Sequence, residues 1–157
     1  MLAEAVGRKL GIPVFAKDWL EAIILRGGLI EGDPQRPLGF TGYELLGILA
    51  QRQLSLGQSV ILDSVATTES IRERWRAMAR QSGADWRVIE CICSDAALHK
   101  RRLEGRQRNI PGWHELHWEE VEELKSRFVQ WNEPRLVIDS IRRFEANLPI
   151  AIEYCLS

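Results

Sequence analysis

Short apolar segments alternate along this chain with longer helical patterns, and this alternation limits the fold more than any other feature of the sequence. Residues typical of strands occur at 13–17, 59–63, 86–93 and 135–139. Helical patterns lie between them and before them; at 2–10, for example, Leu2, Val6 and Leu10 share one helical face. Strands that alternate with helices of about ten or more residues indicate βαβ units and a parallel sheet.

Two of the strand segments, 60–63 and 87–93, are nearly continuous in apolar residues. This is expected where helices cover both faces of a sheet. We therefore predict an α/β fold with a three-layer α/β/α parallel sheet, in which these two segments are the most buried strands. A chain of 157 residues suits one domain, which we place at 1–157.

The composition excludes several classes of protein. A net charge of −1 argues against a chain that coats nucleic acid or a membrane surface, although it leaves room for a local basic patch. No apolar run approaches the roughly 18 residues needed to span a bilayer. The odd number of cysteines (Cys91, Cys93 and Cys155) suggests reduced thiols, so we expect a cytoplasmic protein.

Local signals place several helix starts. Asp18 is a candidate N-cap for a helix at 18–27, and Thr41 with Glu44 matches a capping box for the next helix. The Gly- and Pro-rich stretch 28–39 is expected to be a loop. Asn147 and Pro149 are expected to begin a short C-terminal helix.

Acidic residues stand at or just after the ends of the predicted strands: Asp18, Asp63, Asp95 and Asp139. In open α/β sheets, ligands bind at the carboxyl ends of the strands. Carboxylates there can bind Mg²⁺ or take a proton from a hydroxyl. The alternative is that each Asp only caps the helix that follows it.

A second candidate feature is a run of basic residues within nine positions: Lys100, Arg101, Arg102, Arg106 and Arg108. Arg102 and Arg106 are like charges four positions apart, which is unfavourable in a helix unless an anion lies between them. Arginine forms bidentate contacts with phosphate. A Pro-Gly pair follows the run and indicates a hinged flap, with Trp113 as its candidate anchor. The alternative is a solvated basic face.

Several of these segments resemble the AAA-domain family of P-loop kinases, which is related to polynucleotide kinase and chloramphenicol phosphotransferase. The segment LHKRRLEGRQRNIPGWHELHWEEVEELKSRF, followed by PRLVIDS, is similar to the family's arginine-bearing lid and final strand. GIPVFAKDWL resembles its second strand, and VILDSV its third strand with a Walker-B-like aspartate. The resemblance covers essentially the whole chain and implies a P-loop nucleoside-triphosphate-hydrolase-like fold, with a lid at about 99–117.

The resemblance also implies roles for particular residues. Asp18 would be the general base that takes the acceptor's proton, and Asp63 would organise Mg²⁺. Arg102 and Arg106 would close over the phosphates of ATP, with Arg101 in support. The implied activity is phosphoryl transfer from ATP to a hydroxyl of a small molecule or a nucleic acid. Nucleic acid would enter only as a substrate, and the acceptor pocket would be set by residues 18–40.

The sequence departs from the family pattern at its beginning. The family carries a phosphate-binding loop of the form GxxxxGKS or GxxxxGKT directly before its first helix, and no such motif occurs here. We therefore expect an N-terminally truncated form that lacks the central first strand and the Walker A loop and binds ATP poorly. The strands at 60–63 and 87–93 should then either pair directly or stand about 9.6 Å apart, which is two strand spacings.

Two functions stay open from the sequence. The first is an ATP-dependent kinase whose activity is impaired in this chain by the missing loop. The second is a catalytically inactive remnant that serves as an interaction module through exposed sheet edges.

Overall fold

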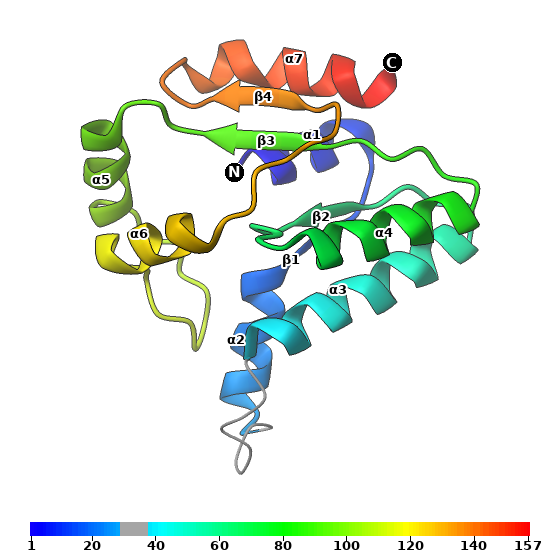
Figure 1. Cartoon of the computed structure of the whole chain (residues 1–157), viewed down its shortest axis with the longest axis horizontal. Coiled ribbons are helices and arrows are strands. Elements are labelled where there is room, and N and C mark those ends of the chain that lie inside the picture. Colours follow the sequence, from blue (N-terminus) through cyan, green and yellow to red (C-terminus); the bar gives the residue numbers. More distant parts are fainter. Residues whose placement is uncertain (29–37) are drawn as a thin grey trace.

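Figure 1 shows the computed structural model of the chain, which describes residues 1–28 and 38–157. Within these residues, helices and strands alternate as the sequence predicts. The helices are α1 (Leu2–Leu10), α2 (Lys17–Arg26), α3 (Leu38–Ser55), α4 (Glu69–Gln81), α5 (Ala96–Glu104), α6 (Trp118–Arg127) and α7 (Phe144–Leu156). The strands are β1 (Val14–Ala16), β2 (Ile61–Asp63), β3 (Ile89–Ile92) and β4 (Leu136–Asp139). Most of the loop predicted at 28–39 lies outside the described residues.

The strands form two parallel sheets of two strands each. β1 pairs with β2, with Ala16 opposite Asp63, and β3 pairs with β4, with Ile92 opposite Asp139. From β4 at the top of Figure 1 the order descends to β1, so β2 and β3 face each other. No ladder joins these two strands within the described residues. The parallel α/β arrangement is confirmed, whereas the missing central first strand stays a prediction.

The prediction that 60–63 and 87–93 are the most buried strands is wrong for the second segment. β2 is half-buried throughout, but Cys91 and Ile92 of β3 are exposed, Ile92 by 38%. In β4, by contrast, Ile138 is buried. The physical reason is that the buried cluster of Leu46, Ala66 and Trp75 packs against Leu62 of β2, whereas no described residue of β3 packs against it.

Three predicted helix starts also need correction. α2 begins at Lys17, directly after β1, so Asp18 lies in the first turn and does not cap the helix. α3 already begins at Leu38, which places Thr41 inside the helix. α7 begins at Phe144 and contains Pro149. The prediction for Asp95 is confirmed, because its carboxylate accepts the backbone N–H of Leu98 at 2.8 Å and caps α5.

The core fixes the positions of β1 and β2. Leu46 of α3 and Trp75 of α4 are buried together, and Phe15 of β1 and Leu62 of β2 pack against them. On the other side, α1 lies so close to β1 that a Cβ atom at Gly7 would stand 2.8 Å from the Ile12 carbonyl oxygen. This close approach requires glycine. The carboxyl ends of β1 and β2 are therefore held firmly side by side.

Candidate functional site

Asp18 and Asp63 belong to the carboxyl ends of neighbouring parallel strands. Asp63 is the last residue of β2 and stands opposite Ala16, two positions before Asp18. Burial raises the pKa of Asp63, and the negative charges of Asp18 and Glu4 raise it further. Asp18 is therefore within electrostatic reach of Asp63, and the strand register places both acids at the same edge of the β1–β2 sheet.

The other two strand-end acids have structural partners in the second sheet. Asp139 accepts the backbone N–H groups of Ser94 at 3.2 Å and Ile141 at 3.1 Å. The hydrogen bonds from Ser94 and Ile141 lower the pKa of Asp139. Asp95 caps α5, as described above. The capping alternative thus applies to Asp95, whereas Asp18 and Asp63 are not explained by it.

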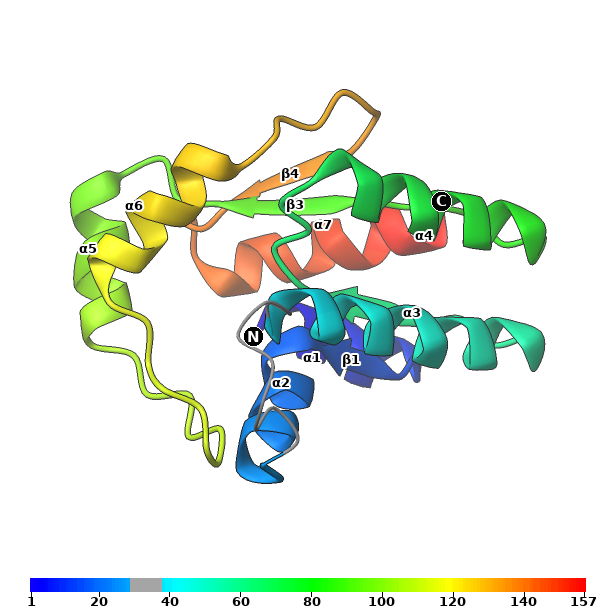
Figure 2. The ribbon, with the colours of Figure 1, turned by 60° about the horizontal axis from the view of Figure 1, so that its bottom comes forward.

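Helices α5 and α6 and the segment between them, residues 96–127, form an arm beside the two sheets. Its tip, residues 105–117, reaches toward α2, as both Figure 1 and Figure 2 show. There Arg108 forms an ion pair with Asp18 of α2. The guanidinium Nε of Arg108 also lies 3.1 Å from Glu115 Oε2, and its backbone N–H donates to Glu115 Oε1 at 2.6 Å. The Arg108 side chain is only 9% exposed, so this contact is a packed one.

Close packing of Gly112 against α2 accompanies this ion pair at the arm tip. Gly112 has a φ of +82°, a left-handed conformation that favours glycine. A Cβ atom at this position would lie 3.3 Å from Arg26 Cβ and 3.5 Å from the Ala22 carbonyl oxygen. The Pro-Gly turn that the sequence identified as a flap therefore lies directly on α2.

The predicted phosphate-binding arginines separate in the structure. Arg106 is exposed as a residue. Partial burial of its guanidinium lowers the pKa of Arg106, and the positive charge of Arg108 lowers it further. The negative charges of Glu115 and Asp18 act in the opposite direction and raise this pKa. Arg106 is thus within electrostatic reach of Asp18. Arg102 instead donates to the Ser140 carbonyl oxygen at 2.6 Å, beside the second sheet. Arg101 is exposed on α5 and makes no ion pair among the described residues.

Arg108 is the functional candidate that sequence reasoning counted but gave no role. Its signal was present, since it belongs to the basic run and stands three positions before Pro111 of the Pro-Gly flap. Its partner Asp18 stands 90 positions away in the chain, and no local pattern links the two.

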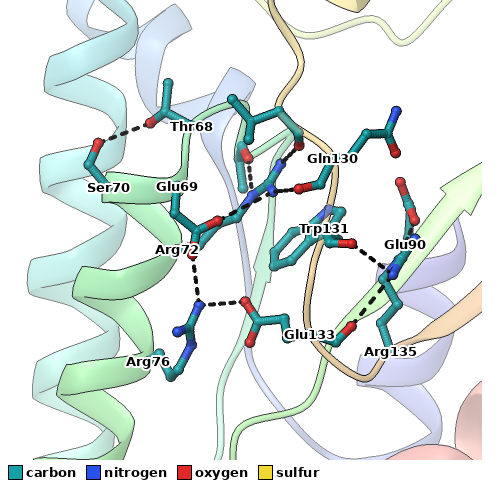
Figure 3. Close-up of polar contacts among 12 residues, drawn as sticks. Thr68, Glu69, Ser70, Arg72, Arg76, Glu90, Gln130, Trp131, Glu133 and Arg135 are labelled. Carbon is teal, nitrogen blue, oxygen red and sulfur yellow. Dashed lines mark hydrogen bonds and ion pairs between the residues drawn. The ribbon is translucent and has the colours of Figure 1, made fainter.

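A second arginine holds the other end of the arm, where residues 128–135 connect α6 to β4. Arg72 of α4 is fully buried. Its guanidinium donates to the carbonyl oxygens of Ala66 at 2.8 Å, Val129 at 2.6 Å and Gln130 at 3.2 Å. It also lies 3.9 Å from the centre of the Trp131 ring. Figure 3 shows how Arg72 reaches from α4 into this segment, which we call the arm base.

Further ion pairs flank Arg72 in Figure 3. Arg76 contacts Glu133 at 2.6 Å, and the same carboxylate accepts the indole N–H of Trp86 at 2.9 Å. Arg135 donates to Glu90 of β3 at 2.5 Å and to the Trp131 carbonyl oxygen at 3.1 Å. The arm base is therefore tied to both α4 and the second sheet.

Carboxylate oxygens are suitable donors for Mg²⁺, which usually takes one or two of them together with substrate phosphates and water. Asp63 fits this use, because it is partly buried near two other acids and makes no ion pair among the described residues. No group of three or more His, Cys, Asp or Glu residues within the described ranges could hold a metal by itself. Asp63 is therefore a candidate donor for a Mg²⁺ ion whose other ligands would be phosphates and water.

Two parallel sheets with covering helices and an arginine-bearing arm over acidic strand ends define a P-loop kinase-like fold. The AAA-domain family profile matches residues 23–131, which is more than half of the chain, so the chain belongs to the AAA-domain family. Within the described residues, no helix has both the length and the apolar character needed to cross a membrane.

Solved structures agree with this assignment of the fold. A kinase from Chloroflexus aurantiacus, described as putative, is 22% identical, with a TM-score of 0.71 over 99% of this chain and 88% of that one. A gluconokinase from Sinorhizobium meliloti is 14% identical, with a TM-score of 0.70 over 99% and 83%. A sugar kinase from a Janibacter species is 16% identical, with a TM-score of 0.64 over 98% and 85%. No curated protein matches the chain.

Proposed function

We propose that this chain is a P-loop kinase-like protein whose family-level activity is the transfer of a phosphoryl group from ATP to a hydroxyl group. The observation that carries the proposal is the placement of Asp18 and Asp63 at or just after the carboxyl ends of neighbouring parallel strands. Arg108 of the arm tip pairs with Asp18, and Arg106 lies within electrostatic reach of it. This is the end of an α/β sheet where ligands bind.

In this proposal Asp18 is the general base. Its carboxylate would accept the proton of the acceptor hydroxyl as the oxygen attacks phosphorus, a role worth about 10²–10⁴-fold in rate. Arg106 would stabilise the negative charge that develops on the transferred group, since its guanidinium already lies within electrostatic reach of Asp18. Arg102 and Arg101 would join it after a movement of the arm, because Arg102 now contacts Ser140.

Asp63 would hold Mg²⁺, directly or through water. The cation would favour the ionised form of Asp63 against burial and against the negative charges of Asp18 and Glu4, which together raise the pKa of this carboxyl. Mg²⁺ bound there would supply charge neutralisation to the phosphates.

ATP binding by this sequence alone is expected to be weak. The sequence contains no GxxxxGKS or GxxxxGKT motif, whose lysine and backbone N–H groups supply most contacts to the β- and γ-phosphates. Isothermal titration of residues 1–157 with ATP and Mg²⁺ should give little or no heat. A micromolar Kd for this chain would contradict the proposal, whereas a chain extended at its N-terminus by a strand and such a loop should bind.

The acceptor would be a hydroxyl-bearing small molecule or a nucleic-acid 5′-hydroxyl. The gluconokinase and the sugar kinase among the structural neighbours favour a sugar or sugar acid. We further propose that residues 1–157 act as one domain with a lid at about 99–117, and that the protein works in the cytoplasm. The free state of Cys91, Cys93 and Cys155 is consistent with a reducing compartment.

A second candidate function is an interaction module, and the separation of the two sheets favours it. β2 and β3 face each other without a ladder between them, so each leaves backbone donors and acceptors open to an added strand. The coding sequence directly upstream of codon 1 separates the two functions. An open frame encoding GxxxxGKS or GxxxxGKT supports the kinase, and an immediate stop codon supports the interaction module.

A further inference from the structure

Arg108 lies between two carboxylates that belong to different parts of the molecule. Asp18 is on α2, whereas Glu115 is on the arm tip itself. Glu115 holds Arg108 twice, through the backbone N–H and through Nε, and the Arg108 backbone N–H is the largest influence that lowers the pKa of Glu115. Glu115 therefore orients the guanidinium from within the arm, independently of the contact with α2.

The contact with α2 occupies the residue that the proposed function needs free. A carboxylate that holds a guanidinium presents fewer lone pairs to an incoming hydroxyl. The arm tip also covers α2 sterically, because Gly112 packs on Ala22 and Arg26. The docked tip thus occupies part of the Asp18 carboxylate, whose side chain is 36% exposed, so Arg108 and an acceptor hydroxyl compete for it.

We propose that Arg108 is a positioning residue that docks the arm tip on Asp18 in the absence of substrate, and that the acceptor hydroxyl takes its place. When Arg108 leaves Asp18, Glu115 keeps it paired, so undocking leaves no unpaired buried charge. The docking step stands on the contacts alone, and its meaning for the acceptor rests on the proposed function.

Hydrogen exchange measured by mass spectrometry on the full chain tests the docking. Amides of residues 105–117, including the Trp113 N–H that donates to Ile110, should be protected in the unaltered chain. Arg108→Gln and Asp18→Asn should each increase their exchange by about fivefold. The double variant should exchange no faster than either single variant, because both changes remove the same contact.

Two further variants separate docking from general loosening of the structure. Arg127→Gln removes an ion pair with Glu123 on the same arm that does not reach the rest of the molecule, so it should leave residues 105–117 unchanged. Gly112→Ala should raise exchange at the tip through steric exclusion while both charges stay in place. Exchange in α3 and α4 should not change in any variant.

Equal exchange in Arg108→Gln and the unaltered chain would overturn the docking proposal, as would additive effects in the double variant. Neither result would concern phosphoryl transfer, which is measured separately as ADP release by an extended chain. Failure of that transfer with normal docking would instead count against the proposed function.

Discussion

The two ends of the arm are each held by an arginine, but the arginines bind different kinds of partner. At the arm base, Arg72 is fully buried and donates to three backbone carbonyl oxygens. At the arm tip, Arg108 pairs with carboxylates whose side chains are 36% and 38% exposed. Carbonyl groups fixed in the chain have no alternative partner, whereas exposed carboxylates can turn to water. The arm base is therefore attached permanently to the rest of the molecule, whereas the arm tip has a contact that can open.

This difference also explains why only one end of the arm belongs to the candidate site. Burial lowers the pKa of Arg72, while the charges of Glu69, Glu133 and Glu90 act against that change and support the charged form. Its two aromatic neighbours, Phe128 and Trp131, lie 5.0 Å and 3.9 Å from the guanidinium carbon. Such an enclosed cation organises the chain around it and has no room to meet a substrate.

The largest expected change in the free energy of unfolding is at the arm base. Arg72→Met should lower the free energy of unfolding by about 3–5 kcal/mol, because it leaves buried carbonyl groups without a donor and removes a buried charge from its partners. Urea denaturation followed by circular dichroism measures this. Arg74→Met on the same helix is the matched control, since Arg74 is 57% exposed in its pair with Glu44 and should cost less than about 1 kcal/mol. Similar losses of folding stability in both variants would show that the arm base is no more strongly held than an exposed ion pair.

At the tip, the same denaturation experiment should give a smaller result. Arg108→Gln should lower the free energy of unfolding by about 1 kcal/mol or less, because Asp18 and Glu115 can be hydrated once the guanidinium is gone. A loss as large as that of Arg72→Met would show that the tip is a structural attachment like the base.

The smallest expected effect concerns Asp63 at the end of β2. Its pKa is raised in the folded chain, so its ionised form is less favourable there than in the unfolded chain. The resulting loss of folding stability is fully present above the pKa that Asp63 has in the folded chain. It disappears as the pH falls toward the ordinary pKa of aspartate.

Asp63→Asn should therefore raise the free energy of unfolding at pH 7 by less than about 1 kcal/mol, with no gain below about pH 4. Thermal unfolding across this pH range is the measurement. Asp85→Asn is the control, because the Asp85 side chain is 92% exposed and its replacement should change little. A loss of stability at pH 7 would show that the acidic site is not under electrostatic strain.

Local patterns in the sequence were sufficient for the order of helices and strands and for the position of Asp63. Apolar periodicity and the Asp95 cap depend on neighbours in the chain, so they could be predicted. The start of α2 was misplaced because β1 runs into the helix without a loop, which leaves Asp18 in the first turn. The exposure of Cys91 and Ile92 depends on which strands the core residues pack against, and strand composition carries no such information.

Local patterns could not predict the arginine contacts either, because the partners lie far away in the chain. Arg72 meets Val129 and Gln130 across 57 and 58 positions of the chain. A hint existed, because Arg72 falls on the same helical face as the buried Trp75 and Ala79. An arginine on an apolar face indicates that its charge is satisfied by some partner, but the partner has to come from the structure.

The most direct test of the account is phosphoryl transfer by a chain that carries an N-terminal strand and a GxxxxGKS or GxxxxGKT loop before residue 1. ADP release is measured against a panel of sugars, polyols and sugar acids for this chain, for Asp18→Asn and for the surface control Asp85→Asn. We predict that the extended chain is active, that Asp85→Asn is equally active, and that Asp18→Asn lowers kcat by about 10²–10⁴-fold. Full kcat in Asp18→Asn would contradict the account, because Asp18 could then not be the base.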